Sequence, residues 1–155
     1  MSPGHFHNRK HLIIRFNPGA ERSHGLRGIR MPRRLTVKLN HLDLQVADVP
    51  RAVTFFEEAF GFQLQSNRRS STIAFLSDDD GFVLVLQRKK SDTDRYPDGF
   101  HFGFLVDDVE SVHSFHARAL GLGLETSEVI ENGRGTQGYC SGPDGLLAEV
   151  GYRPR

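Results

Sequence analysis

Two histidines and one glutamate stand in strand-like segments of this 155-residue chain, where polar groups are costly to bury. His41 and His101 each open a segment rich in Leu or Phe, and Glu149 is the only carboxylate in Leu146-Leu-Ala-Glu-Val150. Two neutral imidazole nitrogens and one carboxylate oxygen suit a divalent ion of iron, manganese, nickel, cobalt or zinc. We therefore predict one metal ion, bound by these three residues.

A simpler interpretation has each histidine hydrogen-bonded in a core and Glu149 paired with an arginine. That interpretation is favoured for any one of the three residues taken alone. The metal site is favoured for the three together, because His41 and His101 occupy the same place in an internal repeat.

The repeat emerges when the chain is shifted by 60 residues, which aligns eight identical residues in 24 positions. The identical pairs are His41 and His101, Val46 and Val106, Asp48 and Asp108, Val49 and Val109, Phe55 and Phe115, Ala59 and Ala119, Gly61 and Gly121, and Leu64 and Leu124. Further along, a shift of 64 aligns Ser77, Asp80 and Gly81 with Ser141, Asp144 and Gly145. The chain therefore contains a duplicated unit.

Each unit is predicted to run strand, helix and three strands. The opening segment 39–46 alternates, with apolar residues at 42, 44 and 46, as a half-buried strand does. Asp48 and Asp108 are expected to cap helices that end at Gly61 and Gly121. The further strands are expected near 62–67, 71–77, 82–87, 123–129, 136–141 and 146–151.

These elements predict an α+β fold of two tandem βαβββ modules, whose mixed sheets curve around a shared metal-binding cavity. We place the domain at 37–152, with module one at 37–88, a linker at 89–99 and module two at 100–152. By the alternation of side chains along strands, the polar face of each opening strand lines the cavity. Asp43, Gln45, Gln87 and Tyr139 are then candidate acid–base or supporting groups, and we predict catalytic roles for Asp43, Gln87 and Tyr139.

Residues 1–38 carry nine basic residues and one acid, a formal charge of +8, and residues 39–155 carry −7. We predict a basic, disordered extension at 1–36, or an upstream start with Met31 as the true initiator. The acidic folded part gives no support for nucleic-acid binding, and no apolar run is long enough to cross a membrane. Cys140 is the only cysteine, so nothing requires an oxidising compartment and we expect a cytoplasmic protein.

Three segments resemble the glyoxalase, bleomycin-resistance and dioxygenase superfamily, also called the vicinal oxygen chelate superfamily. Leu39-Asn-His-Leu-Asp-Leu-Gln-Val-Ala-Asp-Val49 is similar to its opening module, and His101-Phe-Gly-Phe-Leu-Val-Asp-Asp108 and Pro143-Asp-Gly-Leu-Leu-Ala-Glu149 are similar to its second module. The resemblance covers about 37–152. It implies metal ligands at His41, His101 and Glu149.

The resemblance also limits the activity. A fourth ligand, as in glyoxalase I, would fall at Val85, which cannot coordinate a metal, although Gln87 could face the same cavity. Asp43 stands where fosfomycin-resistance transferases have threonine, and its charge would repel a phosphonate. Bleomycin-type binding proteins usually lack the metal ligands.

The resemblance implies a metal-dependent enzyme that acts on a small substrate with vicinal oxygens, by dioxygenase or by lyase or isomerase chemistry. The alternative is a non-catalytic protein of bleomycin-resistance type that sequesters a drug or metabolite. Superfamily members often pair, so we also expect a homodimer. Whether one metal site lies within a chain or across two chains is left open.

Overall fold

The protein is described by a computed structural model over residues 37–65 and 70–154. Its elements run β1 His41–Val46, α1 Val49–Phe60, β2 Gln63–Leu64, β3 Ile73–Ser77, β4 Val83–Arg88, β5 Phe102–Leu105, α2 Val109–Gly121, β6 Ile130–Asn132, β7 Gly135–Ser141, the 3-10 helix η1 Pro143–Gly145 and β8 Leu147–Tyr152. The predicted basic extension at 1–36 lies outside the described residues. None of the described helices has the length and apolar character needed to cross a membrane.

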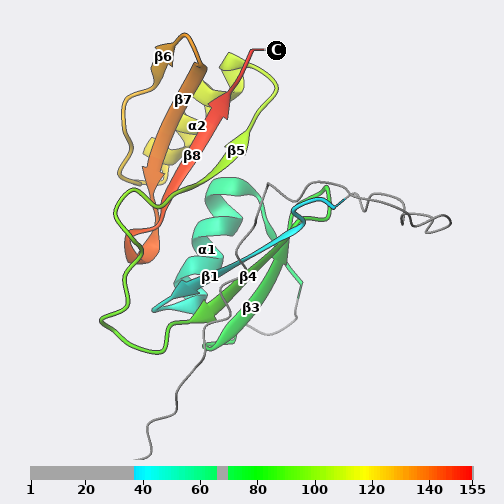
Figure 1. Ribbon diagram of the computed structural model, residues 1–155, viewed down its shortest axis with the longest axis vertical. Coiled ribbons are helices and arrows are strands. Elements are labelled where there is room, and N and C mark those ends of the chain that lie inside the picture. The colour runs from blue at the N-terminus through cyan, green and yellow to red at the C-terminus, as the bar shows by residue number, and fades with distance from the viewer. Residues whose placement is uncertain (1–36, 66–69, 155) are drawn as a thin grey trace, which may run out of the picture. The chain divides into compact units, whose positions relative to one another are not determined.

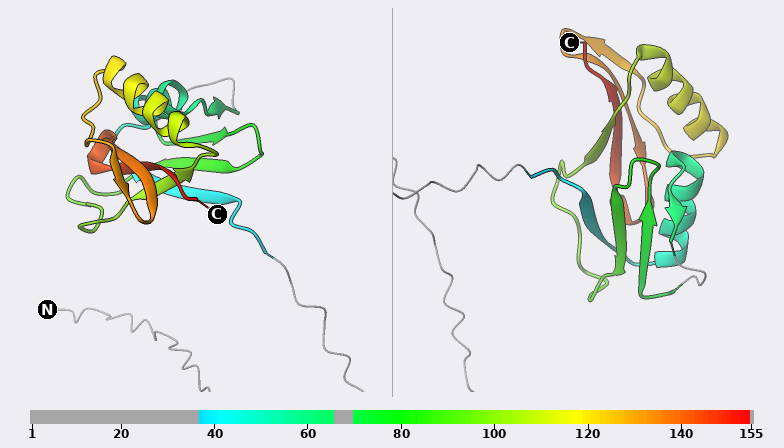
Figure 2. Two further views of the ribbon diagram at one scale, coloured as in Figure 1. Left: turned by 90° about the horizontal axis from the view of Figure 1, so that it is seen from above. Right: turned by 90° about the vertical axis from the view of Figure 1, so that its right-hand side faces the viewer.

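The strands form two four-stranded sheets of the same topology (Figure 1). The first has the order β1-β4-β3-β2 and the second β5-β8-β7-β6, and in each the first pair is parallel and the others are antiparallel. Both helices lie on the same side of the two sheets (Figure 2). The predicted α+β fold of two βαβββ modules is confirmed, and the face of each sheet away from the helices is called its open face below.

Register confirms the equivalence of the two modules. Asp43 pairs with Val85 in the first sheet, and Gly103 pairs with Glu149 in the second. These are the partners that the shifts of 60 and 64 residues predict. Val85 therefore occupies in module one the place that Glu149 occupies in module two.

Helix caps account for three of the four predicted helix ends. Asp48 accepts a hydrogen bond from the backbone of Arg51, and Asp108 accepts one from Ser111. Gly61 ends α1 in the left-handed conformation, with φ 76°. The second helix ends at Gly121, as predicted, but the cap differs, since Leu122 is the C-cap residue and the left-handed conformation falls at Gly123, where φ is 71°.

The strand predicted at 123–129 is wrong. Residues 125–127 run beside β7 and share backbone hydrogen bonds with it, from Ser127 N to Tyr139 O and from Ser141 N to Glu125 O. They form only one isolated bridge, between Thr126 and Cys140, and the regular strand β6 comes later. Only Leu124 and Val129 are apolar in 123–129, and the segment also contacts α2, where Nε2 of His116 lies 3.0 Å from the carbonyl oxygen of Ser127.

A cluster of aromatic rings joins the two modules. The ring of Phe56 lies 5.7 Å from that of Phe102, and Phe60 lies 4.7 Å from Phe104 and 5.3 Å from Phe115. The helix α1 thus packs on strand and helix of module two as well as on its own sheet. Burial of this shared core holds the two modules together.

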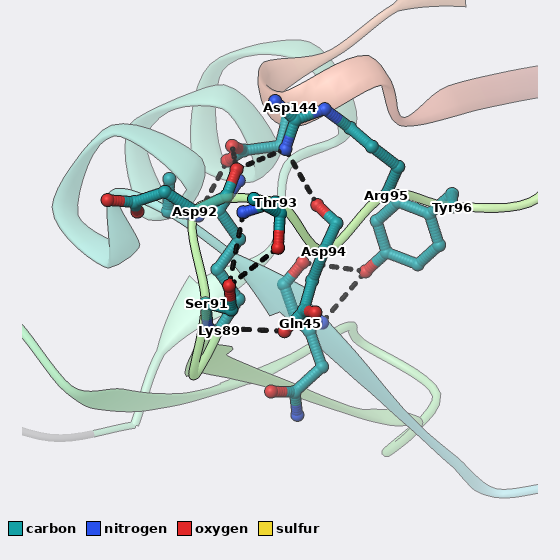
Figure 3. Close-up of polar contacts among 10 residues, drawn as sticks. Gln45, Lys89, Ser91, Asp92, Thr93, Asp94, Arg95, Tyr96 and Asp144 are labelled. Carbon is teal, nitrogen blue, oxygen red and sulfur yellow. Dashed lines mark hydrogen bonds and ion pairs between the residues drawn. The ribbon is translucent and has the colours of Figure 1, made fainter.

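A polar cluster also ties the two modules together, at the C-terminal end of β1 (Figure 3). Asp144, in η1, accepts hydrogen bonds from the backbone of Ala47 at 2.7 Å and from Lys89 at 3.2 Å. The hydroxyl of Tyr96 accepts from the backbone N–H of Gln45 and donates to its carbonyl, at 2.8 and 2.9 Å. The segment between the modules therefore covers part of the free edge of β1.

Candidate metal centre

Strands β5 and β8 bring two of the predicted ligands together. Nε2 of His101 lies 3.4 Å from Oε2 of Glu149, and the side chains are 45% and 12% exposed. Gly103 makes room for this pair, because a Cβ at that position would lie 3.3 Å from Cβ of Glu149. The neighbours Leu146, Ala148 and Val150 face the core, as predicted, so Glu149 is left on the open face.

In both histidines the ring nitrogen Nδ1 lies within hydrogen-bonding distance of an oxygen. Nδ1 of His101 lies 3.0 Å from the carbonyl oxygen of Gly99, and Nδ1 of His41 lies 3.1 Å from Oδ1 of Asn40. An acceptor at Nδ1 places the proton there and leaves the lone pair on Nε2. Metal-binding histidines are usually held in this way.

The spacing of His101 and Glu149 also fits two ligands of one ion. Donor atoms about 2.1 Å from an ion, at angles between about 90° and 110°, lie about 3.0–3.4 Å from each other. The separation of 3.4 Å between Nε2 and Oε2 meets this condition. The donor set present thus fits a divalent metal ion.

Tyr139 lies beside the same carboxylate, on the adjacent strand β7. Its hydroxyl donates to Oε2 of Glu149 at 3.1 Å, and its ring centroid is 6.0 Å from that of His101. Burial, and then the hydrogen bond to the carboxylate, raise the pKa of the Tyr139 phenol. Tyr139 therefore stays protonated and able to donate at neutral pH.

Two groups beside Glu149 were not found from the sequence. Arg153 donates from Nη2 to Oε1 of Glu149 at 2.8 Å and from Nη1 to Gln137 at 2.7 Å. Arg153 directly follows β8 and has the same parity as Glu149, and Gln137 has the same parity as Tyr139 on β7, so alternation could have identified both. The simpler interpretation, in which Glu149 pairs with an arginine, holds for one carboxylate oxygen only.

The remaining predicted residues form a separate cluster on the open face of the first sheet. Asp43 accepts hydrogen bonds from the side-chain amides of Gln87 and, at 3.3 Å, Gln45. His41 lies on the same strand, two residues before Asp43. Over residues 37–65 and 70–154, no group of three His, Cys, Asp or Glu side chains is close enough to hold one ion. A single chain therefore does not bring His41 to the other two predicted ligands.

An apolar cavity adjoins His101, the residue directly before β5. It has a volume of about 460 Å³, and His101 and Gly103 form part of its wall. Most other residues that line it are leucines and phenylalanines, among them Leu42, Phe82 and Phe102. An uncharged apolar group could therefore lie against the imidazole of His101.

Several solved structures share this fold. A lactoylglutathione lyase from Agrobacterium tumefaciens is 18% identical over 76% of this chain and 94% of its own, with a TM-score of 0.61. The fosfomycin resistance protein FosX from Listeria monocytogenes is 21% identical over 77% and 96%, with a TM-score of 0.64. No curated protein matches the chain.

Two comparisons identify the family. A possible glyoxalase from Bacillus cereus is 31% identical over 75% of this chain and 99% of its own, with a TM-score of 0.66. Residues 38–150 match the family model of the Glyoxalase/Bleomycin resistance protein/Dioxygenase superfamily. The chain belongs to this superfamily.

Proposed function

We propose that the protein is a divalent-metal-dependent enzyme acting on a small substrate with vicinal oxygens, by dioxygenase or by lyase or isomerase chemistry. The observation that carries the proposal is the pair of Nε2 of His101 and Oε2 of Glu149, 3.4 Å apart, with Nδ1 of the histidine bound to a carbonyl oxygen. FosX, which shares the fold, has been crystallised with Mn(II). The metal of the present protein is one of iron, manganese, nickel, cobalt and zinc.

The third ligand is proposed to come from a second copy of the chain. His41 of one protomer would join His101 and Glu149 of the other when the open face of module one meets that of module two. Large apolar side chains are exposed on these faces: Phe75 is 45% exposed, Leu105 73% and Ile130 45%. A homodimer would cover them and complete the site.

The ion, when bound, would polarise an oxygen of the substrate and stabilise negative charge developing on it. The chain's own groups would act around it. Tyr139 holds a proton next to Oε2 of Glu149 and could donate it to a substrate oxygen. Asp43, held by Gln87, could accept a proton from the substrate in the completed cavity. These catalytic roles are part of the proposal.

Metal content of the purified full chain tests the proposal. Inductively coupled plasma mass spectrometry should find about one ion per chain, and Glu149→Ala and His41→Ala should each lose it. His113→Ala, on the exposed side of α2, is the matched control and should keep the ion. No stoichiometric ion in the native chain, even after reconstitution with each candidate metal, contradicts the proposal.

Mixed dimers test whether the site is shared between chains. His41→Ala and Glu149→Ala proteins, each without metal, should regain about a quarter of a site per chain when equal amounts are unfolded together and refolded, because about half of the dimers are then mixed. The mixed dimer then has one site with all three ligands. Absence of any recovered metal would place the three ligands within one chain.

A second candidate function, ligand sequestration without catalysis, is favoured by the apolar cavity beside His101. A binding protein of this kind would hold a drug or metabolite with undiminished affinity after treatment with a chelator and after His101→Ala. The enzyme would lose substrate binding or turnover in both cases.

A cytoplasmic location, expected because Cys140 is the only cysteine, is also part of the proposal.

A further inference from the structure

The two oxygens of the Glu149 carboxylate have different partners. Oε1 accepts a hydrogen bond from Nη2 of Arg153 at 2.8 Å. Oε2 accepts from the hydroxyl of Tyr139 at 3.1 Å and is the oxygen nearest to Nε2 of His101. The side chain of Glu149 is only 12% exposed, so water does not compete freely for either oxygen. The carboxylate is therefore oriented, with one oxygen towards the arginine and the other towards the histidine.

Arg153 is itself held in place. Its second terminal nitrogen, Nη1, donates to Oε1 of Gln137 at 2.7 Å, so the guanidinium connects two acceptors on neighbouring strands. The register explains the arrangement, because Gln137 pairs with Gly151 while the next residue on that face, Tyr139, pairs with Glu149. A planar guanidinium bound at two nitrogens has a defined orientation.

Gly151 provides the space for this contact. A Cβ at that position would lie 3.1 Å from Oε1 of Glu149 and 3.6 Å from Cβ of Gln137. The side chain of Arg153 can therefore reach back along the open face to the carboxylate. The charge of Arg153, its second hydrogen bond to Gln137 and the space left by Gly151 all favour the same position for Oε1 of Glu149.

We propose that Arg153 and Gln137 are positioning residues that restrict Glu149 to binding a metal ion through Oε2 alone. This inference rests on the proposed function, in which Glu149 is a metal ligand. A carboxylate that binds through one oxygen occupies one coordination position, whereas a carboxylate that binds through both occupies two. The arginine thus keeps a position on the ion open for the second oxygen of a chelating substrate.

The number of coordination positions that remain open on the ion can be counted. A six-coordinate ion with one donor atom from each of three residues keeps about three positions for water. If Oε1 were released and also coordinated, about two would remain. A substrate with vicinal oxygens needs two positions, so the difference decides whether a further ligand can bind beside it.

The test uses the full chain loaded with Mn(II), because the spectrum of this ion reports its bound water. Broadening of the electron paramagnetic resonance lines in ¹⁷O-water should give about three waters for the native protein and about one fewer for Arg153→Met. Gln137→Leu, which removes the anchor of Arg153, should also lower the number. Arg134→Met, in the turn between β6 and β7, is the matched control and should keep the native number.

Circular dichroism first establishes that each variant is folded. If Arg153→Met does not fold, the water number of Gln137→Leu tests the inference. Native protein with bound Mn(II) and the same water number in the folded variants would overturn this inference alone. Native protein that binds no Mn(II) would overturn this inference, and the proposed function falls with it only if iron, nickel, cobalt and zinc do not bind either.

Discussion

Replacing Asp144 should destabilise the whole domain, because this carboxylate joins the turn before β8 to module one. One oxygen accepts from the backbone N–H of Ala47, directly after β1, and the other from Lys89, directly after β4. The side chains of Asp144 and Lys89 are 16% and 10% exposed. Both contacts are therefore largely shielded from water.

The magnitude follows from the groups left behind in Asp144→Ala. A hydrogen bond to a charged acceptor is worth about 1.5–3 kcal/mol, and removal of one partner of a buried ion pair costs about 3–5 kcal/mol. The two terms overlap, because one carboxylate serves both contacts and the pair is not fully buried, so we expect about 3 kcal/mol. Asp144 also has a φ of 60°, where alanine is less favourable than aspartate or asparagine by about 1 kcal/mol. The expected total is about 4 kcal/mol.

Asp144→Asn separates these terms. Asparagine tolerates the left-handed conformation and keeps an oxygen for the N–H of Ala47, so it loses chiefly the charge opposite Lys89. We expect it to cost about 1–2 kcal/mol. Asp98→Ala, in the exposed segment between the modules, is the control and should cost less than about 0.5 kcal/mol.

Urea unfolding of the full chain, followed by circular dichroism, measures these differences in the free energy of unfolding. A loss below about 1 kcal/mol for Asp144→Ala would refute the assigned role. Equal losses for Asp144→Ala and Asp144→Asn would show that neither the bond to Ala47 nor the backbone conformation contributes.

Three further predictions concern the core and the turns. Burial raises the pKa of the Cys140 thiol from 9.0 to about 11, so the stability that its neutral form contributes is complete below pH 9 and is lost as the pH rises to 11. The free energy of unfolding should fall by about 3 kcal/mol more in the native chain than in Cys140→Ala over this range. Gly135 has a φ of 131°, and a Cβ there would lie 2.0 Å from a backbone oxygen at the end of β8, so Gly135→Ala should cost at least about 3 kcal/mol in thermal or urea unfolding. Gly133→Ala, which meets no atom within 4 Å, should change stability little. Tyr96→Phe removes both hydrogen bonds to the backbone of Gln45 and should cost about 1 kcal/mol, detectable as faster amide hydrogen exchange at the edge of β1.

The amino-acid sequence determined the repeated architecture. Local signals were sufficient for this: side chains alternate along β1, Asp48 and Asp108 cap the two helices, and the left-handed conformation at Gly61 ends the first. Each signal depends on residues close together in the chain. The strand predicted at 123–129 was wrong, because those residues lie beside α2 and β7 and form only one isolated bridge, between Thr126 and Cys140.

For the candidate site, the sequence predicted the types of ligand and determined the face of each strand on which these residues lie. Repeat positions related His41 to His101, and alternation placed Glu149 on the open face of β8. Tertiary structure decided which of these residues meet. It joined His101, Tyr139 and Glu149 through the order β5-β8-β7, and added Arg153 at the second carboxylate oxygen.

His41 lies in the other sheet, and alternation along a strand contains no information about the distance between two sheets. Sequence therefore predicted a triad of ligands, and the tertiary structure separated it into a pair on one sheet and a single histidine on the other. The packing of Phe56 and Phe60 on module two fixes how the modules of one chain meet, and that packing depends on contacts between residues far apart in sequence.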